Sequence, residues 1–255
     1  MITVKHSGHI GDVIYSLPAV KAIAETRKEK VTYYLHQGVL IPTDYDNGSP
    51  KPALSKEFAE FIKPLIEAQP YIEKCMIYIN GTDITVPLDY DLDMFRRLPV
   101  NFWLGHLPLY YMHLTGYFTD YSAPWLTVKE EDKNDYYRDK VIIGRSPRNI
   151  NPDVDFSILN KIEEKIYFVG TADEYLSINK IIPRIEYIKV SDAYEMACLI
   201  ASCKLYIGNS SFNFALAEGL KKTRLFEMNL KIQSLMPCGN VKYFTNTEQL
   251  ISEIL

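Results

Sequence analysis

Four short segments of the sequence place small, polar or charged residues directly after expected β-strands, which is where α/β proteins gather ligand-binding groups. The first runs from Gly8 to Asp12 and leads into an apolar pattern with helical spacing. Its two glycines, Gly8 and Gly11, allow tight backbone geometry. Asp12 is either the N-cap of the helix or a general base that faces a ligand, and spacing alone favours the cap. The neighbouring His9 is a donor to phosphate or a loop histidine without a role.

The second segment, residues 144–151, leaves the first expected strand of the second half of the chain. Arg145 and Arg148 could each bind a diphosphate through two parallel hydrogen bonds, and Ser146 and Asn149 could add further ones. The alternative is an exposed polar loop without a ligand. These residue types predict a candidate diphosphate site, and the sequence leaves both interpretations open.

Two further segments read strand, small polar turn and helix. In the third, Gly170 makes the turn, and Glu174 either complements the helix dipole or accepts hydrogen bonds from ribose hydroxyls. In the fourth, Asn209, Ser210 and Ser211 precede an apolar helix. Three small polar residues exceed what one helix cap needs, so we expect backbone N–H groups and hydroxyls to hold a phosphate here.

The familiar catalytic and metal-binding motifs are absent from the sequence. It contains no GxxxxGK[ST] loop, no GxSxG elbow, no HExxH and no CxxC pair. Asp89, Asp91 and Asp93 have the spacing of a divalent-metal site, but no glycine turn or distal glutamate accompanies them. We therefore expect a solvated loop at this run, and no metal site.

The elements that must position these residues alternate between strand and helix. Apolar runs predict strands at residues 2–6, 31–36, 75–79, 141–144, 166–169, 185–190, 205–207, 225–228 and 241–244, and helices at 13–24, 55–69, 156–164, 173–182, 192–202, 211–220 and 247–254. Residues 85–123 are less regular and rich in aromatic side chains. Such alternation predicts an α/β protein with parallel sheets. A charged stretch at 129–135 predicts two Rossmann-like domains, at residues 1–128 and 138–255, facing each other across a ligand cleft.

Composition excludes several classes of protein. The 255 residues are 47% hydrophobic and 24% charged, so the chain can bury a core and is not disordered. A net charge of −4 argues against a broad electrostatic grip on nucleic acid. Four scattered cysteines, no apolar run of about 18 residues and a strand at the very start favour a cytoplasmic protein without integral membrane contact.

Taken together, these segments resemble the heptosyltransferase-like glycosyltransferases, family nine of the GT-B fold. The residues that carry the resemblance are GDVIYSLPAV at 11–20, which is similar to the family's GDV-aromatic-x-LPA signature. Weaker matches are PWL at 124–126, the Arg145–Arg148 loop, residues 170–174 and residues 199–218. The resemblance implies inverting, metal-independent transfer from a nucleotide-diphosphate sugar, ADP- or UDP-linked, without a required cofactor.

The resemblance also implies roles for particular residues. Asp12 aligns with the family's catalytic base, and Glu174 lies near a ribose-binding acid. The donor phosphates and nucleotide would be held by Gly11, Arg145, Ser146, Arg148, Asn149, Gly170, Asn209, Ser210 and Ser211, and the acceptor side would include His9, Arg96 and Trp103. The sequence departs from the family where Asn209 replaces an acid and Phe214 stands at a frequent histidine.

Three alternatives remain open on the sequence. One is a phage-type glycosyltransferase that acts on modified DNA bases, where aromatic side chains could stack on an extruded base. Another is a nucleotide-sugar epimerase or hydrolase, which would turn over the donor without an acceptor. The third is a non-catalytic nucleotide-sugar binder in which Asp12 is dispensable. The expected partners are therefore a nucleotide sugar and, as acceptor, a glycan, a lipid-linked sugar or a modified DNA base.

Overall fold

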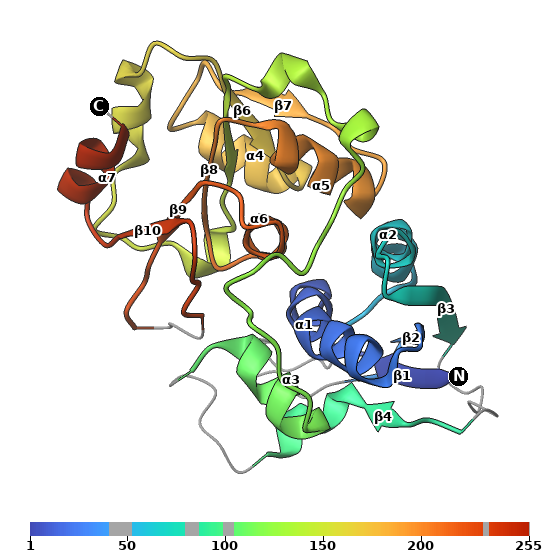
Figure 1. Ribbon diagram of the computed structural model, residues 1–255. Helices are drawn as coiled ribbons and strands as arrows, with labels where there is room; N and C mark the ends of the chain where they lie inside the picture. The colour runs from blue at the N-terminus through green and yellow to red at the C-terminus, as the bar shows by residue number, and fades with distance from the viewer. Residues whose placement is uncertain (41–52, 80–86, 99–104, 232–234, 255) are drawn as a thin grey trace.

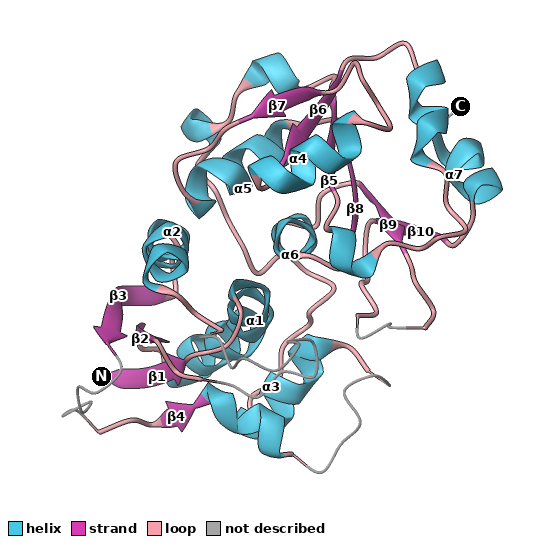
Figure 2. Ribbon diagram, turned by 180° about the vertical axis from the view of Figure 1, so that it is seen from behind, coloured by secondary structure: helices cyan, strands magenta, loops and turns pink. Residues whose placement is uncertain are grey.

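Two parallel β-sheets organise the chain, each accompanied by helices (Figures 1 and 2). The computed structural model describes residues 1–40, 53–79, 87–98, 105–231 and 235–254. The first sheet has four strands in the order β3-β2-β1-β4, and every pair in it is parallel. Its strands are β1 (Ile2–His6), β2 (Val31–Gln37), β3 (Ile72–Ile79) and the short β4 (Tyr90–Asp91).

The second sheet has six parallel strands in the order β10-β9-β8-β5-β6-β7. Its strands β5 and β6 are buried along their whole length, which explains their uninterrupted apolar sequences. The strands are β5 (Val141–Gly144), β6 (Ile166–Val169), β7 (Glu186–Ile188), β8 (Leu205–Asn209), β9 (Arg224–Glu227) and β10 (Val241–Phe244).

Seven α-helices accompany the sheets in the described part of the chain, and α7 stays beside the second sheet (Figure 1). Helix α2 buries Ala59, Ile62, Leu65 and Ile66 on one face, whereas Phe58, which the apolar pattern placed on that face, is exposed. The helices are α1 (Ile10–Arg27), α2 (Lys56–Glu67), α3 (Leu107–Thr115), α4 (Ala172–Asn179), α5 (Ala193–Ser202), α6 (Phe212–Gly219) and α7 (Thr247–Ile254). No helix among the described residues is both long and apolar enough to cross a membrane.

The two halves meet through helices and through the segment that connects them. Helix α1 contacts α6, and α2 contacts α5. In the connecting segment, the backbone N–H groups of Trp125 and Leu126 both donate to the carbonyl of Gly219 at 3.0 Å, and the Tyr71 hydroxyl donates to the Trp125 carbonyl at 2.7 Å. One hydrophobic cluster includes residues of both halves. The halves therefore pack directly against each other.

Most of the elements predicted from the sequence are confirmed, and the α/β class with two parallel sheets is confirmed with them. The segment expected to be irregular contains β4, a 3₁₀ helix at Leu92–Arg97 and α3. Helix α3 begins with Pro108 in its first turn and ends at Gly116, whose φ of 75° suits glycine, so standard start and stop signals were present. The helix predicted at 156–164 is wrong in type: it is a 3₁₀ helix, Phe156–Lys161.

A buried charged cluster lies where α6 meets the first half. Glu218 is fully buried and receives hydrogen bonds from Lys221 and Arg224. Near it, the Tyr15 hydroxyl, His106 Nε2 and Trp125 Nε1 are buried without a hydrogen-bond partner among the described residues, and His106 Nε2 lies 3.8 Å from Glu218 Oε1. Burial, together with the charges of Lys221 and Arg224, lowers the pKa of His106 to about 3, so this ring is neutral.

The unpartnered hydroxyl predicts a stabilising substitution, because a buried polar group without a partner costs about 1–3 kcal/mol. Tyr15→Phe is expected to raise the free energy of unfolding by about 1 kcal/mol, measured by urea denaturation. Tyr71→Phe is the matched control, because its hydroxyl is hydrogen-bonded to Trp125, and it should lower that free energy by a similar amount. Equal losses in both variants would mean that the Tyr15 hydroxyl has a partner.

Candidate functional site

Asp12 lies in the first turn of α1, at the carboxyl-terminal edge of the first sheet. The N-cap of this helix is His9, whose side chain makes no capping hydrogen bond, so the interpretation of Asp12 as the N-cap is wrong. A carboxylate in the first turn is stabilised by the positive end of the helix dipole. Asp12 therefore lies at the amino end of a largely buried helix, with its side chain 20% exposed.

Arg96 forms an ion pair with Asp12, which joins two of the residues predicted from the sequence. The bond runs from Nη2 of Arg96 to Oδ2 of Asp12, and the guanidinium lies 4.8 Å from the centre of the Phe95 ring. Oδ1 of Asp12 accepts no hydrogen bond from the residues that the structure describes. One carboxylate oxygen is thus held in place while the other can still accept a proton.

The loop beneath Asp12 is shaped by His6 and Gly8. The Gly8 N–H donates to Nδ1 of His6 at 2.8 Å, so the other ring nitrogen, Nε2, carries the proton and donates to the Tyr111 hydroxyl at 2.7 Å. Burial lowers the pKa of His6, which agrees with a neutral ring. A Cβ at Gly8 would lie 2.5 Å from His6 Cε1 and 3.2 Å from Asp12 Oδ2. The carboxylate can sit over this loop because residue 8 has no side chain.

The three aspartates with metal-like spacing contact residues of strand β1 and of the loop that follows it. Asp89 accepts hydrogen bonds from Thr3, Asp91 pairs with Lys5 at 2.9 Å, and Asp93 accepts two from Ser7. The expected solvated loop is therefore wrong for this run, which forms β4 and starts the 3₁₀ helix. Burial opposes the ionisation of Asp93, yet the hydrogen bonds from Ser7 and the charge of Lys5 hold its pKa below its usual value.

Arg145, predicted from the sequence as a diphosphate ligand, is paired with an acid of strand β9. Its Nε and Nη2 donate to the carboxylate of Glu227 at 2.7 and 2.6 Å, and its guanidinium stacks on Phe156 at 3.9 Å. The Asn151 N–H donates to the same carboxylate at 2.7 Å. A charge this deeply buried requires such a partner, so the pair fastens the end of β5 to the end of β9.

Asn209 and Asn149 tie the two candidate phosphate loops together. The fully buried Asn209 side chain accepts from the Ser146 N–H at 2.9 Å and donates to the Ser146 carbonyl at 2.7 Å. Asn149 donates to the carbonyl of Ser210. These side chains position the two loops relative to each other, and a ligand contact by Asn149 or Asn209 stays a prediction.

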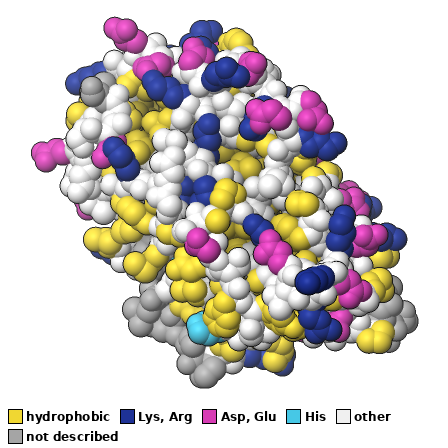
Figure 3. Space-filling view, viewed as in Figure 1, with side chains coloured by type: hydrophobic (Ala, Val, Ile, Leu, Met, Phe, Trp, Pro, Cys, Tyr) yellow, Lys and Arg dark blue, Asp and Glu magenta, His cyan; other side chains and the backbone are white. Residues whose placement is uncertain are grey.

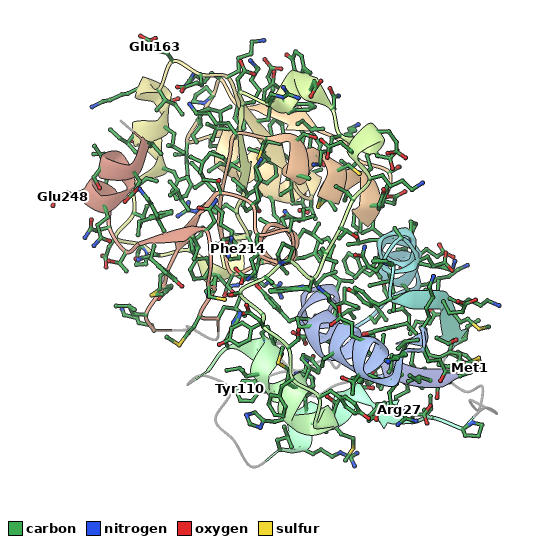
Figure 4. All side chains as sticks on the ribbon, viewed as in Figure 1. Met1, Arg27, Tyr110, Glu163, Phe214 and Glu248 are labelled. Carbon is green, nitrogen blue, oxygen red and sulfur yellow. The ribbon has the colours of Figure 1, made fainter. Side chains whose placement is uncertain are left out.

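Arg148, Ser210 and Ser211 remain as groups that a ligand could reach. Arg148 is exposed in a 3₁₀ helix, Pro147–Asn149, and makes no hydrogen bond or ion pair with the described residues. Ser211 is the N-cap of α6, and its hydroxyl accepts from the Phe214 N–H at 3.3 Å. Phe214 itself is core, 4.5 Å from the Phe226 ring, and lies near the middle of the molecule (Figure 4).

Gly170 and Glu174 form the predicted turn and helix start. Glu174 and Thr171 build a capping box, in which Oε2 of Glu174 accepts from the Thr171 N–H at 2.9 Å. A Cβ at Gly170 would lie 2.8 Å from that oxygen. The capping role of Glu174 therefore accounts for one carboxylate oxygen, and a ribose contact through the other stays a prediction.

Gly11 brings the two candidate sites together. A Cβ at Gly11 would lie 3.9 Å from the Cα of Phe212, so the amino ends of α1 and α6 approach each other across the two halves. Figures 1 and 2 both show the two helices side by side. Asp12 follows Gly11 directly, and Ser211 precedes Phe212. The candidate base and the candidate phosphate loop therefore share one location.

The remaining residues predicted for the acceptor side are His9, at the start of α1, and Trp103, which lies outside the described residues. A separate hollow of about 320 Å³ lies at the other end of α1, with Lys28 and Tyr71 among its lining residues. Asp12 and Lys28 are about 24 Å apart along a helix. This hollow is thus no part of the candidate site.

Several solved structures have a fold similar to that of this chain. Heptosyltransferase II of E. coli matches with a TM-score of 0.66 at 11% identity, over 99% of this chain and 98% of that chain. A family 9 glycosyltransferase from Veillonella parvula matches with a TM-score of 0.62 at 14% identity, over 99% and 90%. E. coli heptosyltransferase WaaC with ADP matches with a TM-score of 0.62 at 10% identity, over 100% and 99%.

At the level of sequence, no family model matches the chain, and no curated protein matches it significantly. The similarity therefore lies in the arrangement of the sheets and helices, and it extends over the whole chain. The fold that the resemblance implied is confirmed by these structures. The chain has the GT-B fold of family 9 glycosyltransferases and heptosyltransferases.

Proposed function

We propose that this protein is a glycosyltransferase that moves a sugar from a nucleotide-diphosphate sugar to an acceptor hydroxyl, with inversion at the anomeric carbon. The observation that carries this proposal is the approach of Gly11 to Phe212. It sets a carboxylate at the amino end of one helix beside the amino end of another, which attracts anions. A general base that lies beside a diphosphate site is the arrangement that sugar transfer from a nucleotide-diphosphate sugar requires.

In the proposed reaction, Oδ1 of Asp12 accepts the proton of the acceptor hydroxyl as its oxygen bonds to the anomeric carbon. The bond from that carbon to the diphosphate oxygen breaks with its electron pair, and the nucleoside diphosphate leaves. Attack from the face opposite the leaving group inverts the centre. Arg148, the Ser210 and Ser211 hydroxyls and the first N–H groups of α6 stabilise the charge on the leaving group.

An ADP-linked sugar is the first donor to test, with a UDP-linked sugar second. WaaC, with the same fold, has been solved with ADP and with ADP-2-deoxy-2-fluoro heptose. Glu174 is the proposed partner of the ribose hydroxyls through its second oxygen. The four cysteines are free thiols, which fits the reducing cytoplasm where we propose that the reaction takes place.

Because Arg148 and the helix amides can neutralise the leaving diphosphate, we propose that transfer needs no metal. TibC of E. coli, which has a similar fold with a TM-score of 0.53, is described as iron-containing. Transfer and donor binding should therefore be measured both with EDTA and with added divalent metals. Loss of turnover in EDTA, restored by a metal, would remove this part of the proposal.

Arg148→Ala is expected to raise the Kd for ADP about tenfold, because a charge-assisted hydrogen bond contributes about 1.5–3 kcal/mol. Isothermal titration calorimetry with ADP measures the change. Arg138→Ala is the control, because Arg138 is also an exposed arginine of the same half and its partner is Asp135. An unchanged Kd in Arg148→Ala would take this residue out of the donor site.

The acceptor is a glycan, a lipid-linked sugar or a modified DNA base, and chemistry on the donor alone is the competing outcome. The face shown in Figure 3 carries acidic and basic side chains interspersed, without a continuous basic stripe for DNA. Consumption of a nucleotide sugar in the absence of any acceptor would indicate an epimerase or hydrolase. Tight donor binding without turnover would indicate a binding protein.

A further inference from the structure

The segment around β4 runs alongside β1 with a constant offset in sequence. Three aspartates at every second position each serve a residue 86 positions earlier, in the pairs Thr3 with Asp89, Lys5 with Asp91 and Ser7 with Asp93. The parallel register of the two strands, with Val4 opposite Tyr90, produces this series. Asp89 and Asp91 lie at alternate positions just before and within β4, whereas Asp93 already belongs to the 3₁₀ helix Leu92–Arg97, which continues the same offset beyond the strand.

The first and the last pair use the same chemistry in different places. Asp89 accepts from the Thr3 N–H at 2.8 Å and from its hydroxyl at 2.9 Å. Asp93 accepts from the Ser7 N–H at 2.8 Å and from its hydroxyl at 2.7 Å. Thr3 lies inside β1, but Ser7 lies in the loop between β1 and α1 that leads to Asp12. Of these two pairs, only that of Ser7 with Asp93 restrains the loop beneath the candidate base.

The same short helix also reaches Asp12 directly. Asp93 and Arg96 are three residues apart in the 3₁₀ helix Leu92–Arg97, where residues at that spacing lie on one face. Arg96 pairs with the Asp12 carboxylate, while Asp93 holds the backbone of Ser7. Leu92 and Phe95 are buried, and the Phe95 ring lies 4.5 Å from Tyr111. The helix is therefore fixed to the core and contacts the loop at two points.

We propose that Asp93 is a positioning residue that, by holding Ser7, sets the place of the Asp12 carboxylate over the loop. The proposal rests on the proposed role of Asp12 as base. It also assigns the helix Leu92–Arg97 to the acceptor side of the site, since Arg96 of that helix pairs with the Asp12 carboxylate. Asp93 thus positions the candidate base, whereas Asp89 stabilises the sheet by holding Thr3 of β1.

Asp93→Asn and Asp89→Asn form a matched pair of variants. Each replaces a carboxylate that accepts hydrogen bonds from one backbone N–H and one hydroxyl, and Asp93 also pairs with Lys5 at 3.4 Å. A purely structural role predicts a loss of stability in both variants without a selective fall of kcat. We expect Asp93→Asn to lower kcat about 30- to 100-fold with the KM for the donor nearly unchanged, because a displacement of about 1 Å can cost that much. Asp89→Asn should keep kcat within about twofold, as expected for a site remote from the reacting groups.

Hydrogen exchange of individual amides supplies a readout that does not depend on catalysis. In Asp93→Asn, the amides of Ser7 and Gly8 should exchange about tenfold or more faster, since a lost charged hydrogen bond is worth at least about 1.4 kcal/mol. In Asp89→Asn, the effect should stay at Thr3. Equal falls of kcat in the two variants, or unchanged exchange at Ser7, would overturn the proposal. If the wild type transfers no sugar, the proposed function fails, and exchange alone decides whether Asp93 holds the loop.

Discussion

Asp12→Asn is expected to lower kcat for sugar transfer about 1000-fold, because an amide cannot take the proton that a general base removes. The Kd for the nucleoside diphosphate should stay within about twofold, since the donor groups come from the second half of the chain. Stability should fall by at most about 1 kcal/mol, because the ion pair with Arg96 is partly exposed. Single-turnover kinetics with donor and acceptor measure the first effect.

The matched control is Asp173→Asn, which removes an acid from the first turn of α4 in the second half. Asp12 and Asp173 occupy the same kind of position relative to a helix dipole, so a general electrostatic effect would appear in both variants. Only Asp12 lies beside α6 and Arg96. Retention of more than about a tenth of wild-type kcat in Asp12→Asn would contradict its role as base.

Glu218→Gln is expected to lower the free energy of unfolding by about 3–5 kcal/mol, because it leaves buried cations without their counter-ion. The carboxylate is fully buried and accepts from Lys221, Arg224 and the Cys238 N–H. It lies at the end of α6, next to the carbonyl that holds the connecting segment. Glu218→Gln should therefore also loosen the contact between the two halves. Urea denaturation measures the loss of stability.

Glu164→Gln is the control for this stability effect. Glu164 forms an exposed ion pair with Lys204 at 3.0 Å, and such pairs contribute at most about 1 kcal/mol. If Glu218→Gln does not fold, Lys221→Met provides the measurement, because Glu218 and Arg224 then still form a neutral pair and the loss should be smaller. Equal effects of Glu218→Gln and Glu164→Gln would contradict the structural role of the cluster.

Much of the fold is predictable from the sequence because strands in a parallel sheet are continuous apolar runs. Strand β5 was predicted with its bounds, and so was β10. Helix α3 was not predicted, since its apolar residues surround the helix and give no one-sided pattern, although Pro108 and Gly116 marked its ends. Periodicity identifies elements that have one buried face, and it fails where a helix is enclosed.

The candidate site was less predictable, because its contacts depend on which strands become neighbours. Arg145 read as a diphosphate ligand, but its partner Glu227 lies 82 positions away, and the strand order β9-β8-β5 brings the two together. Asn209 was likewise expected to be a phosphate ligand because it is a polar residue after a strand. Its side chain instead forms hydrogen bonds with the backbone of Ser146. A polar residue after a strand indicates only that it needs a partner, which can be a ligand or another loop.

Asp12 could be singled out early as a candidate base because residues 11–20 resemble the GDV-aromatic-x-LPA signature, whereas the local spacing alone favoured a helix cap. Asp93 could not, because its function comes from the pairing of β4 with β1 across 86 positions. Nothing in the run of three aspartates distinguishes the one that holds the loop from the one that holds the strand. That distinction needs the register, which the structure supplies.

The most direct test of the central claim is a thermal-shift panel of nucleoside diphosphates and their sugars, on wild type and on Asp12→Asn. A ligand at 100 times its Kd stabilises by about 2.7 kcal/mol, which for a chain of this size raises the Tm by about 5–10 °C. We predict that one nucleotide, ADP before UDP, shifts both proteins equally. No shift with any nucleotide would contradict the account, because the loops at Arg148 and Ser211 would then hold no diphosphate.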